Sequence, residues 1–249
     1  QHRGLIERLD SINSDQDLCK KALADFLAGK RCKFPRFYFT SEADLLDILS
    51  NGSCPAKVMR HINKVLLATA SLRLESSSAS KPRAISFISG VGEEQVDFEP
   101  AVSLEGKVEF YMHTILTAQR DTLQKNLERS QKRYPLRPRA EWLLESNPAG
   151  YSLDPAQIAI LVASIQSVMV IEGAMDNNTL VLYSDRQKQD LIDLVRLTQT
   201  NLKGSERQRV MCLITMDAHT RDILGKLIKE VSVDKNDFQW QSQLKHRFI

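Results

Sequence analysis

The stretch FPRFYFTSEADLLDILSNG, residues 34–52, decides the fold of this region. Four aromatic side chains fall within its first six residues, and Pro35 prevents an α-helix from passing through them. The sequence therefore predicts a short extended segment that is largely buried. Thr40 or Ser41 is positioned to cap the next helix, because a hydroxyl oxygen accepts a hydrogen bond from a free backbone N–H at a helix start. The apolar positions of that helix are Leu45, Leu46, Ile48 and Leu49.

Helical spacing of apolar residues continues on both sides of this stretch. Upstream it covers residues 5–27 with a polar break at 13–17, and Gly29 is predicted to end the helix. Downstream, Pro55 suits the first turn of another helix. A solvated loop is predicted at residues 76–80.

Two short strands and a long helix are expected next. Residues 84–89 and 95–98 alternate apolar and polar side chains around a Gly-Val-Gly turn, which is typical of a β-hairpin. A long helix is predicted from about Glu105 until Pro135 forbids it. Because a two-stranded ribbon is only marginally stable by itself, the hairpin should pack against neighbouring helices.

The last part of the chain predicts three helices and a short aromatic tail. After a proline-containing connection over residues 134–152, the Asp154-Pro155 pair is expected to start the first helix. Asp185 is expected to open the second, and Ser205 with Gln208 forms a capping box for the third. The aromatic and apolar residues of the tail are Phe238, Trp240, Leu244 and Phe248.

Composition limits the classes of function. Of 249 residues, 42% are hydrophobic, which is enough to bury a sizeable core in one elongated or two modest units. The chain has 34 basic and 31 acidic residues, and this balance argues against generic nucleic-acid binding. The longest apolar run, residues 158–171, is interrupted by polar side chains, so the sequence predicts a soluble chain without a membrane span.

Cysteine usage and the first residue indicate the setting. The four cysteines lie far apart and form no CxxC pair, which favours a reducing, intracellular compartment and no metal site. The chain begins at Gln1 with neither an initiator Met nor an apolar leader, which suggests a piece of a longer polypeptide rather than a secreted product.

Motifs for catalysis are missing from the sequence. No GxxxxGK[ST] run that would hold phosphates occurs, and the five histidines form no HExxH pattern. His219 near Asp217 and Asp222 is the strongest catalytic candidate, but side chains two residues apart do not face one another on a helix. Glu93 and Glu94 cannot act on one substrate as paired carboxylates, because neighbouring residues in a strand point to opposite faces. They are interpreted as solvated turn residues. We therefore expect no catalytic residue, cofactor site or metal site in this chain.

One charge asymmetry stands out. Residues 119–139 contain seven basic and two acidic side chains. A solvated helix face is the favoured interpretation, followed by a protein-docking surface and then by nucleic-acid binding, for which only Tyr134 and Trp142 offer stacking nearby. The candidate docking residues are Arg120, Lys125, Arg129, Lys132 and Arg133.

Residues 34–52 closely resemble the FPRFYF-plus-acidic-helix signature of dynein heavy chains, where it lies in the linker that precedes the ATPase ring. Three further stretches are similar to that family and fall in its order: GEEQVDFEPAVSLEGKVEFYMHTIL at 92–116, MDAHTRDILGKLI at 216–228 and NDFQWQSQLKHRFI at 236–249. The chain departs from the family where Phe110 or Tyr111 replaces a usual Trp, and again near Met169. The stretch from Gly92 resembles axonemal heavy chains more than cytoplasmic ones.

The resemblance implies a mainly α fold, namely the elongated helical bundles of the dynein linker with one small β-hairpin. Residues 1–33 would end the preceding linker helices, and 34–133 would form a subdomain with the FPRFYF segment, the hairpin and the long helix. Residues 134–249 would form a C-terminal bundle that runs to the junction with the first ATPase module. The implied mechanical or structural residues are Phe34, Pro35, Arg36, Phe37, Tyr38, Phe39, Leu45, Leu46, Trp240, Leu244 and Phe248.

The implied function is a non-catalytic lever that bends and straightens with the nucleotide state of the first ATPase module. Its direct partner would be the AAA-type ring of the same heavy chain, and its indirect partners would be microtubules and other dynein chains. ATP and magnesium would bind only in the parent motor. The implied location is cytoplasmic, in the cytoskeleton of a ciliary or flagellar axoneme.

Two further points stay open at this level. The hinge of such a lever is expected either at residues 134–152 or at residues 76–80, because hinges are usually a few loop or element-terminal residues. The alternative function is a stand-alone helical scaffold or adaptor that binds proteins through the basic helix. Neither function involves nucleic acid or a membrane.

Overall fold

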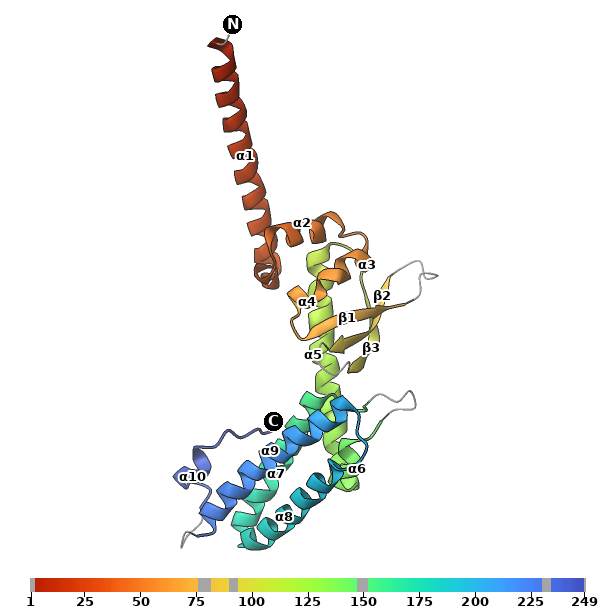
Figure 1. The fold of residues 1–249 in the computed structure, drawn as a ribbon, viewed down its shortest axis with the longest axis vertical. Helices are drawn as coiled ribbons and strands as arrows, with labels where there is room; N and C mark the ends of the chain where they lie inside the picture. The colour runs from red at the N-terminus through yellow and green to blue at the C-terminus, as the bar shows by residue number, and fades with distance from the viewer. Residues whose placement is uncertain (1–2, 76–81, 90–93, 147–151, 230–233, 249) are drawn as a thin grey trace. The chain divides into compact units, whose positions relative to one another are not determined.

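The computed structural model describes residues 3–75, 82–89, 94–146, 152–229 and 234–248. The chain divides into two compact units. Unit 1 consists of Gln1–Gly90 and Val96–Arg120, and unit 2 of Val91–Gln95 and Asp121–Ile249. Helices dominate both units, which confirms the mainly α fold class (Figure 1).

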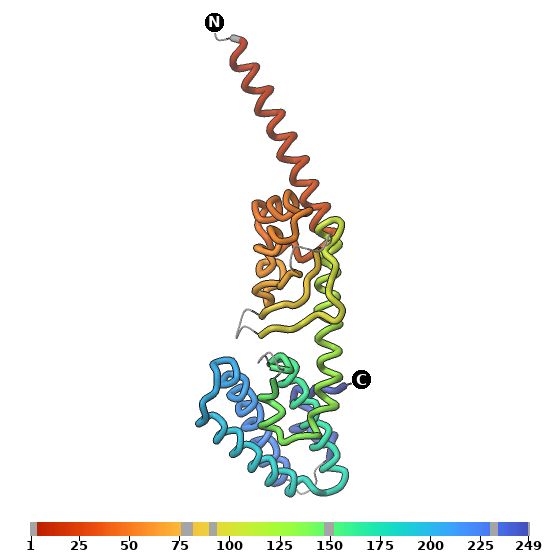
Figure 2. Tube along the Cα trace, turned by 90° about the vertical axis from the view of Figure 1, so that its right-hand side faces the viewer, coloured from red at the N-terminus to blue at the C-terminus, as the bar shows by residue number. Residues whose placement is uncertain are grey.

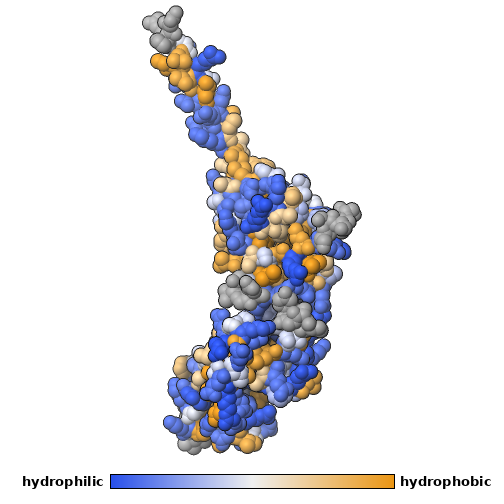
Figure 3. All heavy atoms as spheres, turned by 45° about the vertical axis from the view of Figure 1, so that its right-hand side comes forward, coloured by the Kyte–Doolittle hydropathy of each residue, from blue (hydrophilic) through white to orange (hydrophobic). Residues whose placement is uncertain are grey.

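Unit 1 opens with α1 (Arg3–Lys33), a single uninterrupted helix. The expected break at residues 13–17 and the expected end at Gly29 are both wrong, because polar residues on an exposed face leave the i→i−4 backbone bonds intact. Side chains 4–26 are all exposed, and only the last turns contact the rest of the unit. Figure 3 shows apolar side chains exposed along this helix.

Short helices follow the FPRFYF segment, which forms the 3₁₀ helix η1 (Pro35–Phe39). The hydroxyl of Ser41 caps α2 (Glu42–Ser50) by accepting the Asp44 N–H at 3.1 Å, as predicted. The helix expected after Pro55 is instead three short pieces: α3 (Pro55–Val58), the 3₁₀ helix η2 (Met59–His61) and α4 (Ile62–Val65).

A three-stranded antiparallel sheet lies in the middle of the chain, in the order β1 (Thr69–Leu74), β2 (Arg83–Ser89), β3 (Gln95–Ser103). The predicted hairpin corresponds to β2 and β3, whereas β1 was not predicted. Leu72 pairs with Phe87 across β1 and β2, and the Phe87 ring lies 5.3 Å from that of Phe98. The third strand completes an apolar face that two strands alone would leave exposed. The predicted loop at 76–80 and the Gly-Val-Gly turn lie outside the described residues.

The long helix α5 (Val108–Arg133) runs beside the sheet, as Figures 1 and 2 both show. Its beginning and end agree with the prediction, and Pro135 follows in the 3₁₀ helix η3 (Tyr134–Leu136). In unit 1 it buries Tyr111, Met112 and Ile115. The Gln119 amide donates a 2.9 Å hydrogen bond to the Thr69 hydroxyl and so joins α5 to β1.

Unit 2 is a helical bundle of α6 (Arg139–Leu143), α7 (Ala156–Asp176), α8 (Leu180–Leu197) and α9 (Gly204–Leu227), with the short α10 (Phe238–Gln241) near its end. α8 contacts α9, and α7 contacts both. One core cluster centres on Trp142 and Val162, and a second joins Ile171, Leu224 and Trp240.

Three helix starts in unit 2 differ from the prediction. α8 begins at Leu180, so Asp185 lies inside it. α9 begins at Gly204, and its capping carboxylate is Glu206, which accepts the Lys203 N–H at 2.9 Å. Asp154 does not cap α7, because its carboxylate is bonded elsewhere. Tertiary contacts explain the α7 start, whereas the α9 start depends on the local bond between Glu206 and Lys203.

By length and composition alone, α7 is apolar enough to cross a membrane, although the sequence was expected to hold no such span. Half of its most apolar window is buried inside the structure. Its buried residues belong to both core clusters of unit 2. α7 packs against both α8 and α9, while its Met169 and Val170 side chains stay exposed.

Candidate functional site

The FPRFYF segment is half buried rather than largely buried, and it is helical rather than extended. Phe34 and Phe37 are fully buried and pack edge to face with ring centroids 5.0 Å apart. Tyr38 and Phe39 are 63% and 73% exposed. The prediction failed because a 3₁₀ turn accepts Pro at its first position and places neighbouring side chains on different faces.

Two interactions fix this turn within unit 1. The Thr40 hydroxyl donates to the Phe37 carbonyl oxygen at 2.8 Å and closes the turn. The Arg31 guanidinium lies 5.8 Å from the centre of the Tyr38 ring, over its face. Pro35 is exposed and Arg36 half-buried, so the two phenylalanines Phe34 and Phe37 anchor the segment.

α2 is the second part of the predicted mechanical set. Leu45 is fully buried, whereas Leu46 is only half-buried. The His61 ring lies between Asp44 and Asp47, with its Nε2 2.7 Å from the Asp47 carboxylate. Hydrogen bonds from Lys64 and Ser41 hold the pKa of Asp44 below its ordinary value.

An ion pair joins the end of α1 to the start of α5. Lys30 donates to Glu109 at 2.8 Å, and the Glu109 side chain is almost completely buried. Burial favours the neutral acid, but the hydrogen bond and charge of Lys30 outweigh it, so the pKa of Glu109 lies below its ordinary value. This pair was not anticipated from sequence, because the two residues are 79 positions apart.

The five candidate docking residues on α5 do not share one environment. Arg120, Lys125, Arg129 and Lys132 are exposed, and Lys125 and Arg129 also interact with other groups of the chain. Arg133 is engaged inside unit 2, where it donates to Glu145 at 2.8 Å and to Asp154 at 2.5 Å. The docking function of this face stays a prediction.

Asp154 lies in a buried polar cluster of unit 2. Its carboxylate accepts hydrogen bonds from the Ser130 hydroxyl at 2.7 Å and from Arg133. Burial raises the pKa of Asp154, while Ser130 and Arg133 oppose that effect. Within residues 134–152, Trp142 and Leu143 belong to the adjoining core, whereas residues 135–138 are exposed.

Glu94 was interpreted as a solvated turn residue, and this is wrong. Its carboxylate lies 2.5 Å from the guanidinium of Arg209, whose side chain is 1% exposed. Both carboxylate oxygens also accept the Ala156 N–H at the start of α7, at 3.1 and 3.2 Å. Glu94 therefore supplies the negative charge that a helix N-terminus favours. Glu93 lies outside the described residues.

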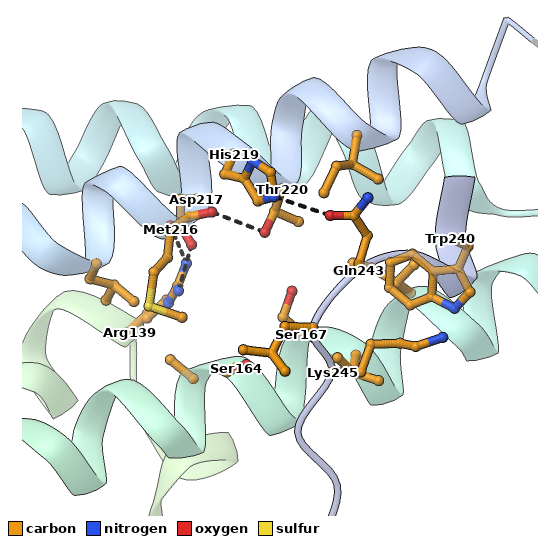
Figure 4. Close-up of a pocket in the computed structure, with 16 residues that line it drawn as sticks. Arg139, Ser164, Ser167, Met216, Asp217, His219, Thr220, Trp240, Gln243 and Lys245 are labelled. Atoms are coloured by element: carbon orange, nitrogen blue, oxygen red, sulfur yellow. Dashed lines mark hydrogen bonds and ion pairs between the residues drawn. The ribbon is translucent and has the colours of Figure 1, made fainter. Parts of the chain in front are cut away.

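The C-terminal segment from residue 234 folds back onto α7 and α9 (Figure 4). The Trp240 indole is buried and donates to Glu172 at 3.2 Å, and Lys245 lies over its ring. His246 is 2.9 Å from the Ser164 hydroxyl. Leu244 is 85% exposed and Phe248 is about half exposed, so Trp240 is the anchor among the predicted tail residues.

A cavity of about 160 Å³ lies beneath this segment. Its wall includes Ser164 and Ser167 of α7 and Thr220 of α9, with the Trp240 and Gln243 side chains on the C-terminal side (Figure 4). Within this wall, the Ser164 hydroxyl is the group that lies 2.9 Å from the His246 ring.

A bidentate ion pair borders the cavity. Arg139 donates to both carboxylate oxygens of Asp217 at 2.5 and 2.8 Å, and both side chains are mostly buried. Burial raises the pKa of Asp217, and Arg139 opposes the shift. Asp217 is therefore committed to Arg139, and His219 is bonded to Gln243 at 3.2 Å, so these two residues form no catalytic pair. The described residues contain no group of three His, Cys, Asp or Glu that could hold a metal.

Comparison with known proteins places the chain in a family. Residues 1–130 match the family described as "Dynein heavy chain, N-terminal region 2". The chain is 38% identical over 252 residues to the dynein alpha chain of the flagellar outer arm of Chlamydomonas reinhardtii, covering 97% of this chain and 5% of that protein. It is 32% identical to human dynein axonemal heavy chain 17 and 34% identical to the ciliary dynein beta chain of Tripneustes gratilla, covering 98% of this chain in each case.

The chain spans 5–6% of the length of these three relatives. These relatives are named as flagellar, axonemal and ciliary dyneins, which agrees with the axonemal location expected from the sequence. The family match covers the FPRFYF segment, the sheet and most of α5, which include two of the stretches that first indicated the resemblance. The chain belongs to the dynein heavy chain family.

Proposed function

We propose that this chain is a non-catalytic mechanical segment of an axonemal dynein heavy chain, the linker that converts nucleotide-driven changes of the ring into movement along microtubules. One observation carries the proposal: α5 is a continuous helix whose residues up to Arg120 belong to unit 1 and whose residues from Asp121 belong to unit 2. A continuous α-helix transmits force between the units along its hydrogen-bonded backbone.

Close packing in both units supports the same function. Two core clusters fill unit 2, and buried aromatic and aliphatic residues anchor η1, α2 and α5 in unit 1. Because protein interiors are close-packed and resist deformation, each unit is suited to move as a body. Bending is then expected outside the packed cores, at residues 134–152 or at residues 76–80.

The exposed apolar residues of α1 support attachment to further parts of the heavy chain. Leu5, Leu9 and Ile12 are spaced by four and three residues, Leu23 and Phe26 by three, and all five are more than 40% exposed. Such a stripe is typical of a helix that packs against another helix. In the proposed linker, α1 packs against helices of the same heavy chain.

A fluorescence measurement in the complete heavy chain tests the mechanical role. A donor at the exposed Cys19 on α1, with the other cysteines replaced, is paired with an acceptor on the ring. We expect the transfer efficiency to change between the nucleotide-free and ATP-bound states. An efficiency that stays constant through the ATPase cycle, in a motor that still moves microtubules, contradicts the proposal.

We also propose that ATP and magnesium bind elsewhere in the heavy chain and not to this segment. Phosphate binding by motors of this kind requires a loop with Lys and Ser or Thr, and the sequence has none. Calorimetric titration of the 249-residue chain with ATP and magnesium is expected to give no saturable heat. A stoichiometric isotherm at micromolar concentration contradicts this.

The basic face of α5 is proposed as a surface that docks against an acidic region of the same heavy chain. Arg120 and Lys132 are the exposed positions to change, because Arg133 is committed to Asp154 and Glu145. Arg120→Glu with Lys132→Glu is expected to slow microtubule gliding more in low salt than in high salt, since exposed charges are screened by salt. Lys226→Glu on the exposed face of α9 is the control. Equal slowing by both variants contradicts the docking function.

A further inference from the structure

The start of α7 and the guanidinium of Arg209 converge on a single carboxylate. α7 is 21 residues long, and its first N–H groups have no partners within the helix, so its N-terminus carries partial positive charge. Arg209 adds a full positive charge from α9, and Glu94 accepts hydrogen bonds from both Ala156 N–H and Arg209 Nη2.

Burying the charged guanidinium of Arg209 costs solvation free energy, and a nearby anion offsets that cost. The residue is 2% exposed, its Nη1 donates to the Leu143 carbonyl oxygen at 3.2 Å, and its Nε has no hydrogen-bond partner among the described residues. Asp154 is close enough to interact electrostatically with Arg209, but its carboxylate is already bonded to Ser130 and Arg133. Glu94 is therefore the carboxylate that balances this buried charge.

The carboxylate comes from a short, separate stretch of chain. Glu94 lies just before β3, in the segment Val91–Gln95, and it is 62 residues from Ala156 and 115 residues from Arg209. Its side chain is 18% exposed, whereas that of Arg209 is 1% exposed. The donors, Arg209 and the N-terminus of α7, thus belong to the helical bundle, whereas the acceptor Glu94 lies outside its helices.

We propose that Arg209 and the N-terminus of α7 form a carboxylate-binding site, which Glu94 occupies within the chain and which accepts a free carboxylate when Glu94 is absent. Glu94 is then bound to the bundle as one exchangeable carboxylate. This proposal concerns the chain alone and does not depend on the mechanical function.

Chemical rescue of Glu94→Ala in the 249-residue chain tests the site. Removing the carboxylate leaves Arg209 buried without a counter-charge, and the melting temperature is expected to fall by at least about 6 °C. Sodium acetate at pH 7 is expected to restore about 3–6 °C at ten times its dissociation constant, whereas sodium chloride at equal ionic strength restores less. Tryptophan fluorescence follows the transition, because both tryptophans lie in unit 2.

Two matched variants separate binding in the site from a general salt effect. Glu94→Ala with Arg209→Met lacks the guanidinium, and Glu94→Gln fills the site with an uncharged amide. Neither is expected to respond to acetate beyond its response to chloride. In Glu94→Ala, the amide resonance of Ala156 is expected to shift with acetate along a saturating curve.

The contrary results are equally definite. Equal rescue by chloride and acetate overturns the carboxylate assignment. An Ala156 resonance that does not move, or acetate rescue that persists without Arg209, overturns the site itself. A Glu94→Ala chain that stays unfolded in acetate also overturns it, since an occupied site restores the missing charge.

Discussion

Asp217→Ala isolates the energetic role of the buried pair that borders the cavity in unit 2. The change leaves the Arg139 guanidinium without the carboxylate that now accepts two of its hydrogen bonds. The side chains are 15% and 7% exposed, so water replaces little of the lost interaction. Breaking such a buried pair costs about 3–5 kcal/mol.

Urea unfolding at 25 °C measures this loss. Trp142 and Trp240 are both buried in unit 2, so the fluorescence change reports the unit that contains the pair. With a slope of about 2 kcal/mol per M, the midpoint is expected to fall by about 2 M. Arg139→Met with Asp217→Leu removes both charges, and its midpoint is expected to stay near that of the parent chain.

Two results would refute this reasoning. The first is an Asp217→Ala midpoint within about 0.5 M of the parent, which would mean that the unpaired guanidinium costs little. The second is a double variant as unstable as the single one, which would mean that shape rather than charge sets the loss. A urea midpoint that falls in Asp217→Ala and returns to the parent value in the double variant supports a loss caused by the unpaired charge.

Three further predictions follow from unit 1 and the C-terminal segment. Phe37→Ala is expected to cost about 3–5 kcal/mol in the free energy of unfolding, while Phe39→Ala costs less than about 0.5 kcal/mol, and similar losses measured by denaturation would contradict the different burial of the two rings. Glu109→Gln is expected to destabilise the chain at pH 7. Because the pKa of Glu109 is lowered in the fold, its contribution is present above the ordinary value of 4.5 and is lost as the pH falls through the folded value. The difference between parent and variant should therefore shrink in urea titrations below about pH 4.5, and a difference that grows there would reverse the assigned direction. Trp240→Ala is expected to speed hydrogen exchange of α10 and the C-terminal end of α7 while leaving α2 unchanged, and unaltered exchange in α10 would show that the indole does not anchor the segment.

Much of the helical content was predictable because it depends on local sequence. Pro135 ended α5 as expected, and Ser41 capped α2 with the hydrogen bond that its residue type favours. The strands β2 and β3 were found by alternation of apolar residues, whereas β1 was missed because its exposed positions are mostly small or polar. Local pattern thus identified the long elements and misplaced several of their ends.

The polar contacts were not predictable, because they join residues far apart in the chain. Nothing near Glu94 indicates Arg209, and nothing near Arg139 indicates Asp217. The choice of capping residue for α7 depends on the same contacts, since Asp154 is drawn to Arg133 and Glu94 takes its place. The FPRFYF segment was located correctly, but its 3₁₀ turn depends on which two rings the surrounding helices bury.

The most direct test of the mechanical function softens α5 where the two units divide. Arg120→Gly with Asp121→Gly changes two exposed side chains and costs about 1 kcal/mol of helix stability at each position. Lys188→Gly with Gln189→Gly makes the same change on the exposed face of α8 as the control. In the complete heavy chain, the ratio of microtubule gliding velocity to ring ATP turnover is expected to fall in the α5 variant and to hold in the α8 variant. An unchanged ratio in the α5 variant would contradict force transmission through this helix.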